Sequence, residues 1–176
     1  WKTLRPRLET ISGYKSTNTV QSMAAMAFAK LNISNITWKV EGVYGQNLTD
    51  HLMLGGYGVE TLADETGLET YVPTTVMSAW TDISTGDDLA FGLFAGVTQN
   101  LGAESDVLGP MWMRGSTIDM IYRISPRVMW NSGKTRFAVE GEYTAASYGA
   151  QQMDATVADA DFVGNFRLLL AAYYFF

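Results

Sequence analysis

The sequence contains no cysteine and a single histidine, His51. The absence of cysteine excludes disulfide bonds and cysteine-based metal sites. A lone histidine with only carboxylates to help it makes a poor metal site, and it offers at most one base for a Ser-His-Asp triad. We therefore expect no enzymatic activity, no bound metal and no cofactor.

Long hydrophobic runs are also missing, because no stretch of 18 or more apolar residues occurs. This absence excludes a transmembrane helix of ordinary length. Charged residues make up only 17% of the 176 residues, and the net charge of -6 argues against nucleic acid as a partner. The abundant residues are glycine and the aromatics, with 17 Gly, nine Tyr, eight Phe and five Trp. This composition favours a β-rich chain and fits the aromatic girdles of membrane barrels.

The carboxy-terminal residues 162–176 alternate in character with a period of two. The even positions are apolar apart from one tyrosine hydroxyl, whereas the odd positions include Asn165 and Arg167. This period predicts a β-strand with one apolar face. At about 3.3 Å per residue and a tilt near 45°, such a strand extends roughly 35 Å along a bilayer normal, enough to cross the hydrocarbon core.

Other segments repeat this pattern. The clearest is 116–131, where seven consecutive even positions are apolar; the pattern continues through Pro126, so we expect one long strand with a local bulge. Together the sequence predicts about eight strands. The predicted strands are 2–14, 19–31, 35–46, 75–83, 88–100, 116–131, 134–148 and 162–176. Segment 19–31 is ambiguous, because its Met and Ala residues also suit a helix.

The lengths of the connections alternate. Three are long (47–74, 101–115 and 149–160) and three are short (32–34, 84–87 and 132–133), and they follow one another in strict alternation. Outer-membrane barrels show this alternation, with long loops outside and short turns inside. Connection 15–18 is an exception, since it is short where a long one is expected. We therefore predict that residues 1–176 form an all-β, antiparallel transmembrane β-barrel domain in a bacterial outer membrane.

Several segments resemble a known family. They are 43–59 (VYGQNLTDHLMLGGYGV), 91–102 (FGLFAGVTQNLG), 121–149 and 167–176 (RLLLAAYYFF). They resemble the carboxy-terminal half of DcaP-like porins of Bacteroidota-type bacteria. The resemblance implies a many-stranded barrel that often trimerises, built from a chain about twice as long, so that Trp1 lies partway through a longer polypeptide. The final strand also resembles the signal that the barrel assembly machinery recognises, with Tyr174 and Phe176 as its aromatic residues.

If the two faces are assigned correctly, one face of the strands carries most of the charges. The candidate pore-lining residues are Arg5, Arg7, Glu9, Lys39, Glu41, Asp119, Arg123, Arg127, Arg136, Glu140, Glu142 and Arg167. Arginines across from carboxylates would create a transverse field that favours small anions, and a guanidinium binds a carboxylate as a fork. The alternative is that these charges only neutralise one another inside a barrel.

These patterns predict a Gram-negative outer-membrane porin that lets small polar or anionic solutes diffuse passively. The expected partners are outer-membrane lipid, the barrel assembly machinery, the solutes and further copies in a homotrimer. Two alternatives stay open. One is a small closed eight-stranded barrel, with 2–14 paired to 162–176, acting as an adhesin or envelope anchor. The other is a barrel subunit of a larger assembly. Loop 47–74 is expected either to fold into the lumen or to move freely at the surface.

Overall fold

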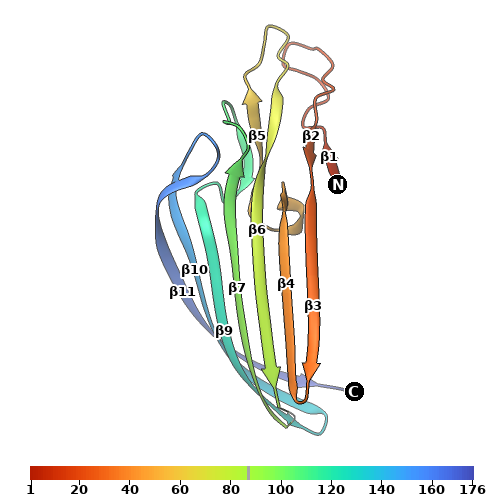
Figure 1. Cartoon of the computed structure of the whole chain (residues 1–176), viewed down its shortest axis with the longest axis vertical. Helices are drawn as coiled ribbons and strands as arrows, with labels where there is room; N and C mark the ends of the chain where they lie inside the picture. Colours follow the sequence, from red (N-terminus) through yellow and green to blue (C-terminus); the bar gives the residue numbers. More distant parts are fainter. Residues whose placement is uncertain (87) are drawn as a thin grey trace.

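The computed structural model describes residues 1–86 and 88–176 and is all-β, with every strand pair antiparallel (Figure 1). Long strands that follow one another in the chain lie side by side in one curved sheet, in the order β11-β10-β9-β7-β6-β4-β3. They are β3 (Ala24–Ile33), β4 (Ile36–Gln46), β6 (Thr70–Thr85), β7 (Leu89–Ala103), β9 (Ile118–Ser132), β10 (Thr135–Gln151) and β11 (Val157–Tyr174).

The remaining elements are short. They are β1 (Lys2–Leu4), β2 (Val20–Ser22), the 3-10 helix η1 (Thr49–His51), β5 (Gly55–Thr61) and β8 (Met111–Arg114). Strand β1 pairs with β2, and β5 pairs with both β6 and β8. Among the residues that the structure describes, no helix has the length and apolar character needed to cross a membrane.

Seven of the predicted long strands are present, with shifted ends. Segment 19–31 is extended, although Met23 divides it into β2 and β3. Strand β6 begins at Thr70, five residues before the predicted start at 75. The bulge expected at Pro126 is wrong, because the pairs Arg127–Glu140 and Ile124–Tyr143 keep the same register on both sides of it.

The predicted strand 2–14 is wrong beyond Leu4. Pro6 has no N–H to donate to a ladder, and Gly13 has a φ of +79°, which a strand does not accommodate. The chain turns there: the Gly13 N–H bonds to the Thr10 carbonyl at 3.0 Å, and Glu9 forms an isolated bridge with Lys15. Local turn chemistry therefore overrides the apolar alternation of this segment.

The predicted alternation of connection lengths is confirmed in part. The predicted long connection 149–160 is wrong in its bounds, because β10 extends to Gln151 and β11 begins at Val157, which leaves only 152–156 between them. Tight turns join the long strands at one end of the sheet, where Ser34, Gly86 and Gly133 have positive φ angles of 56°, 86° and 57°. The long connections 47–69 and 104–117, and the shorter connection 152–156, all lie at the other end (Figure 1). An apolar cluster lies at this end, where Val107 and Ala155 of the connections are buried together with Val72 of β6.

The sheet has one apolar and one polar face, because the register aligns residues of like character across all seven strands. The apolar face carries Ala27, Ala29 and Leu31 of β3; Trp38, Val40 and Tyr44 of β4; Ala79 and Ile83 of β6; Phe91, Leu93 and Val97 of β7; Tyr122, Ile124 and Trp130 of β9; Phe137, Val139 and Tyr143 of β10; and Phe166, Leu168 and Leu170 of β11. The polar face carries Lys30, Lys39, Glu41, Asp82, Arg123, Arg127, Glu140, Glu142 and Arg167.

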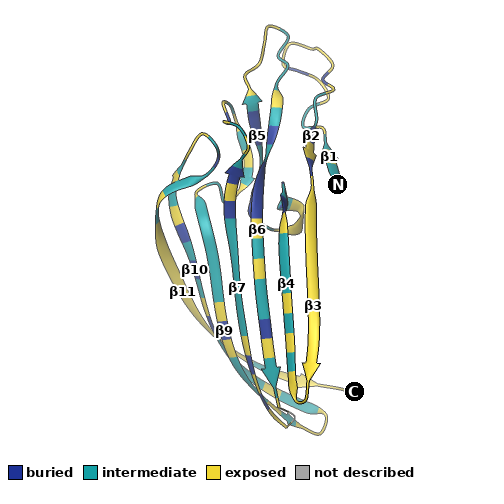
Figure 2. Cartoon of the chain, in the orientation of Figure 1, coloured by how far each residue is buried: buried dark blue, intermediate teal, exposed yellow. Residues whose placement is uncertain are grey.

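Burial is inverted relative to a water-soluble sheet protein. Leu170 and Phe166 on the apolar face are 72% and 68% exposed, whereas Asp82 and Glu142 on the polar face are 7% and 9% exposed. Figure 2 shows the exposed residues along β3 and β11. Side chains converge on the polar face, since Arg127 of β9 reaches Asp82 of β6 across β7. We infer that the polar face is the concave side of the sheet.

The two outermost strands, β3 and β11, each pair on one side only within the described chain. Strand β1 pairs with β2 rather than with β11, so a barrel closed by 2–14 and 162–176 is not formed. Since six successive antiparallel pairings separate β3 from β11, these two edge strands run in the same direction.

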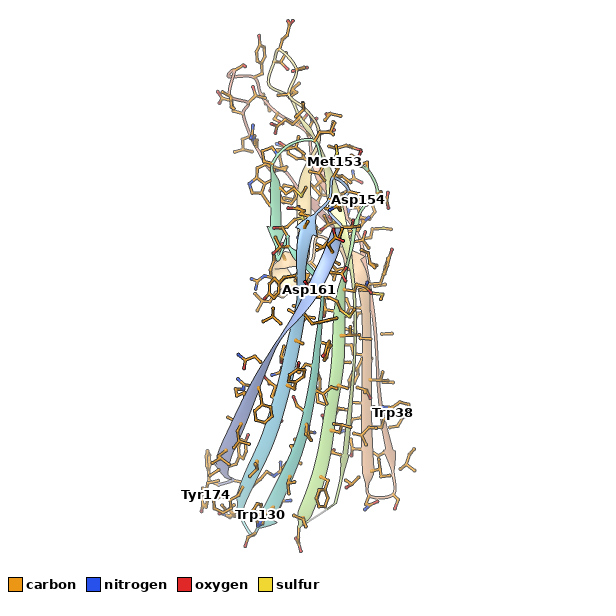
Figure 3. The ribbon with its side chains drawn as sticks, turned by 90° about the vertical axis from the view of Figure 1, so that its left-hand side faces the viewer. Trp38, Trp130, Met153, Asp154, Asp161 and Tyr174 are labelled. Atoms are coloured by element: carbon orange, nitrogen blue, oxygen red, sulfur yellow. The ribbon has the colours of Figure 1, made fainter. Side chains whose placement is uncertain are left out.

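We expect the connection 152–156 to loosen at low pH because of Asp154, which lies at the long-loop end of the sheet (Figure 3). Hydrogen bonds from the hydroxyl and the N–H of Thr156 hold the pKa of Asp154 below its usual value. Because the pKa of this carboxyl is lower in the folded chain than in the unfolded chain, its ionised form stabilises the fold at pH values above the unfolded-state pKa of about 3.9. This stabilisation is lost as the pH falls through the folded-state pKa.

Limited proteolysis of the 152–156 connection checks this expectation. Asp154→Ala should be cut faster than the parent at pH 7, and the difference should vanish once the pH is low enough to protonate Asp154 in the folded parent. Asp161→Ala is the control, because Asp161 is exposed on the adjoining strand β11 and its carboxylate forms no hydrogen bond or ion pair within the described residues. A difference between parent and Asp154→Ala that persists unchanged at low pH would contradict the role of the ionised carboxylate.

Candidate functional site

A first ion cluster joins three strands on the polar face. The guanidinium of Arg127 (β9) grips the carboxylate of Asp82 (β6) as a fork, with N–O distances of 2.7 and 3.0 Å. The Nζ of Lys39 (β4) lies 4.0 Å from the same carboxylate. Lys30 of β3 is directly opposite Lys39 in the register. One carboxylate thus holds two cations, with a third cation on the next strand.

Gly92 of β7 makes room for this cluster. It is paired with Arg127 in the register, and a Cβ on it would lie only 2.6 Å from the Nε of Arg127. The arginine side chain therefore lies flat across β7 and reaches Asp82 because residue 92 has no side chain.

We expect Gly92→Ala to displace Arg127 and to lower the free energy of unfolding by about 1–2 kcal/mol, the cost of overpacking plus a weakened ion pair. Gly42→Ala on the apolar face is the matched control, since a Cβ there meets no atom within 4 Å. Urea unfolding in detergent micelles measures both. Equal effects of the two substitutions would show that Gly92 does not accommodate the guanidinium.

A second ion cluster lies on the neighbouring strands. Glu142 (β10) is 2.8 Å from the guanidinium of Arg167 (β11) and also pairs with Arg123 (β9). Here too one nearly buried carboxylate is shared by two cations. Each cluster therefore carries a net positive charge, which favours anions near the polar face.

Aromatic rings continue from the second cluster across the polar face. The guanidinium carbon of Arg123 lies 5.9 Å from the centroid of the Phe94 ring. Phe94 stacks on Trp80 at 5.9 Å, and Trp80 lies 6.1 Å from Phe28 of β3. The indole N–H of Trp80 donates to Glu41 at 3.1 Å. We call Phe28, Trp80 and Phe94 the aromatic row.

The connection between β4 and β5, together with the first residues of β5, folds over the polar face at the end of β6 that lies near the long connections. The Gly56 N–H donates to the hydroxyl of Thr74 at 2.7 Å, and a Cβ on Gly55 would lie 2.9 Å from Val76. Thr74 and Val76 are fully buried beneath it. They lie on the same face of β6 as Ser78, Trp80 and Asp82. The expectation that loop 47–74 folds into a lumen stays a prediction, because the described residues form an open sheet.

Charged groups anchor the start of this connection. The Nζ of Lys2 bonds to the carboxylate of Asp50 and to the Asn47 carbonyl, both at 2.9 Å. The Lys2 hydrogen bond is the main cause that lowers the pKa of Asp50. His51 lies beside it in η1 and is exposed.

The structure brings most of the predicted pore-lining residues together. Lys39, Arg123, Arg127, Glu142 and Arg167 form the two clusters, Glu41 binds Trp80, and Glu140 is opposite Arg127 in the register.

The other predicted residues lie away from the clusters. Arg136 is near the tight turns, where it donates to Asn131 at 2.7 Å and lies over the ring of Phe175. Asp119 is the second residue of β9. Arg5, Arg7 and Glu9 lie outside the long strands, and Arg7 is 3.5 Å from Glu69.

Sequence reasoning missed Asp82, Lys30 and the aromatic row. Asp82 falls in segment 75–83, which is short and less clearly alternating. The signal was present, because Ser78, Trp80, Asp82 and Ser84 occupy the even positions between Ala79, Thr81 and Ile83. Lys30 lies in the segment whose strand character was ambiguous.

A scan against models of protein families, a search of curated proteins and a search of solved structures each found no match for this chain. The resemblance to DcaP-like porins, and the assembly-signal role of Tyr174 and Phe176, therefore stay predictions.

Proposed function

We propose that this chain is part of a transmembrane β-barrel in a bacterial outer membrane. The observation that carries the proposal is the apolar face, which runs without interruption across seven strands and is more exposed than the charged face behind it. In water such a face would be strongly unfavourable. Against lipid it is the expected outer surface of a barrel, with the polar face toward the lumen.

The distribution of aromatic residues supports this orientation. Towards the tight turns the apolar face carries Trp38, Trp130 and Tyr174, which Figure 3 places near that end of the molecule. Towards the long connections it carries a ring cluster of Tyr122, Tyr143 and Phe162, with centroids 5.5 to 6.0 Å apart. Aliphatic residues and glycine fill most of the band between them. Two aromatic belts around an aliphatic band are typical of membrane barrels.

The free edges of β3 and β11 need partners in this setting, because unpaired backbone groups are costly in lipid. Because β3 and β11 run in the same direction, they cannot pair with each other in an antiparallel way to close a barrel. An all-antiparallel barrel that contains this sheet needs an odd number of further strands. The family resemblance favours strands of the same polypeptide, and the alternative is a larger assembly in which this chain is one component.

We propose further that the polar face lines a water-filled passage for passive diffusion of small polar or anionic solutes. Support comes from the two ion clusters, in each of which two cations share one carboxylate. Such a lining attracts anions while its paired charges stay hydrogen-bonded. Further proposed features are a DcaP-like trimer and a β11 segment read by the assembly machinery, with the free edge of β11 available for strand addition.

The test is the conductance of the full-length protein in a planar bilayer with a KCl gradient. We expect stable channels whose reversal potential indicates anion preference. Replacing Arg123, Arg127 and Arg136 together with alanine should bring the chloride-to-potassium permeability ratio down to about one or below, because one cation of each cluster and a third arginine of the polar face are removed.

Arg7→Ala is the control, since Arg7 lies outside the long strands and pairs with Glu69. An unchanged reversal potential in the triple variant would refute the role of the clusters in selectivity. Absence of any conductance in a correctly inserted protein would refute the passage itself.

A further inference from the structure

The aromatic row is unusual for the polar face on which it lies. Phe28, Trp80 and Phe94 place three large rings among Lys39, Glu41, Asp82 and Arg123, and the Phe28 residue is 52% exposed. The ion clusters alone do not require these rings. In a water-filled passage, an apolar strip is unfavourable unless a solute covers it.

The surroundings of the row define what such a solute needs. Aromatic faces are electron-rich and attract the C–H groups of a ring laid flat on them. At one end Arg123 lies over Phe94 and presents a cation with several N–H donors. Beside Trp80 lies Glu41, and beside Phe94 lies Asp82, whose carboxylate oxygens accept hydrogen bonds.

A hollow next to Gly96 lies between Trp80, Phe94 and Arg123. Ser78, Trp80, Phe94, Thr98 and Arg123 are among the residues that line it. A Cβ on Gly96 would lie 3.1 Å from the Cβ of Trp80 and 3.2 Å from the Phe94 ring, so a larger residue would fill the space between the rings. The hydroxyl groups of Ser78 and Thr98, two of the lining residues, are hydrogen-bonded to each other at 2.9 Å.

We propose, building on the passage proposed above, that the aromatic row and Arg123 form a binding site for a sugar ring that carries a carboxylate. The apolar face of the sugar stacks on Trp80 and Phe94, and its carboxylate lies against the guanidinium of Arg123. Its hydroxyl groups donate to Glu41. An aromatic acid fits less well, because it has no hydroxyl donor for this carboxylate.

Block of the ion current by added solutes tests this site. Glucuronate should reduce the current of the full-length protein at a concentration at least fivefold lower than glucose, which lacks the carboxylate. It should also act at least fivefold below acetate, which lacks the ring. Benzoate serves as the probe for an aromatic acid, and it should be weaker than glucuronate.

Two matched variants of β7 locate the site. Phe94→Leu removes a ring of the row, and we expect the half-blocking concentration of glucuronate to rise about fivefold, as for the loss of one stacking contact. Phe91→Leu makes the same change on the apolar face and should leave both conductance and block unchanged.

The outcomes separate this inference from the proposed function. A protein that gives no channels at all overturns both. Anion-selective channels that glucuronate does not block, or that benzoate blocks more strongly, overturn the sugar site and leave the passage standing. Equal loss of block in both phenylalanine variants also overturns the site, because the effect would not come from the aromatic row.

Discussion

Leu168→Arg is expected to lower the stability of the protein in lipid by about 2–4 kcal/mol, the cost measured for a cation on the lipid face of a membrane barrel near the bilayer midplane, which is where the proposed barrel places residue 168. Leu168 lies on the apolar face of β11, is 62% exposed and is paired with Gly141, which offers no polar partner. It is roughly midway between the two aromatic belts. The arginine would have to be solvated within the hydrocarbon region, and folding into vesicles monitored against urea measures the loss.

Leu169→Arg is the matched control on the next residue of the same strand. Leu169 faces the polar side and is paired with Glu140, which would receive the new cation. We expect this change to cost less than about 1 kcal/mol, as for a solvated ion pair. Equal costs at 168 and 169 would contradict the assignment of the two faces.

The cysteine-free chain allows a direct second measurement at the same two positions. A cysteine at position 168 that carries an environment-sensitive fluorophore should be quenched by lipid-attached quenchers. A cysteine at 169 should instead react with a membrane-impermeant thiol reagent. The reverse pattern would place the polar face against lipid.

Asp82→Asn is expected to destabilise the protein by about 2–3 kcal/mol. Removing one partner of a buried ion pair costs about 3–5 kcal/mol because the other charge is left unpaired. The cost is reduced here, since the side chains of Arg127 and Lys39 keep 18% and 38% of their surface exposed. The variant should also increase the anion preference of the proposed passage, because Lys39 and Arg127 lose the carboxylate that they share.

A double-mutant cycle with Arg127→Gln measures the interaction energy between Asp82 and Arg127 apart from their other contacts. The double variant Asp82→Asn/Arg127→Gln should recover about 1 kcal/mol or more relative to the sum of the single changes, because neither charge is then left unpaired. Denaturant unfolding gives the stability and the reversal potential gives the selectivity. Simple additivity of the two substitutions would show that the fork between them contributes nothing.

The sequence by itself determined the all-β class, the positions of most long strands and the two-faced character of the sheet. The reason is local: a period of two separates the faces of any strand, so Ile124 and Arg123, or Leu168 and Arg167, point to opposite sides whatever their neighbours are. The alternation of tight and long connections was visible for the same reason, because turn residues such as Gly133 mark where strands end.

Local patterns failed where the backbone conformation depends on turns or on distant partners. The apolar alternation of 2–14 suggested a strand, but Pro6 and Gly13 turn the chain after Leu4. The pairing of β5 with β6 and β8 inside the long connections depends on contacts between loops distant in sequence, such as the hydrogen bond from Val59 to the carbonyl of Pro110.

Only the tertiary structure decided which charges share a carboxylate. The alternation places Lys39, Asp82 and Arg127 on faces of separate strands, but the cross-strand register decides that all three meet while Gly92 leaves the space between them. The same register aligns Phe28, Trp80 and Phe94 into one row. Register is a relation between strands, set by the turns and by packing on both faces, and no single segment of the sequence contains it.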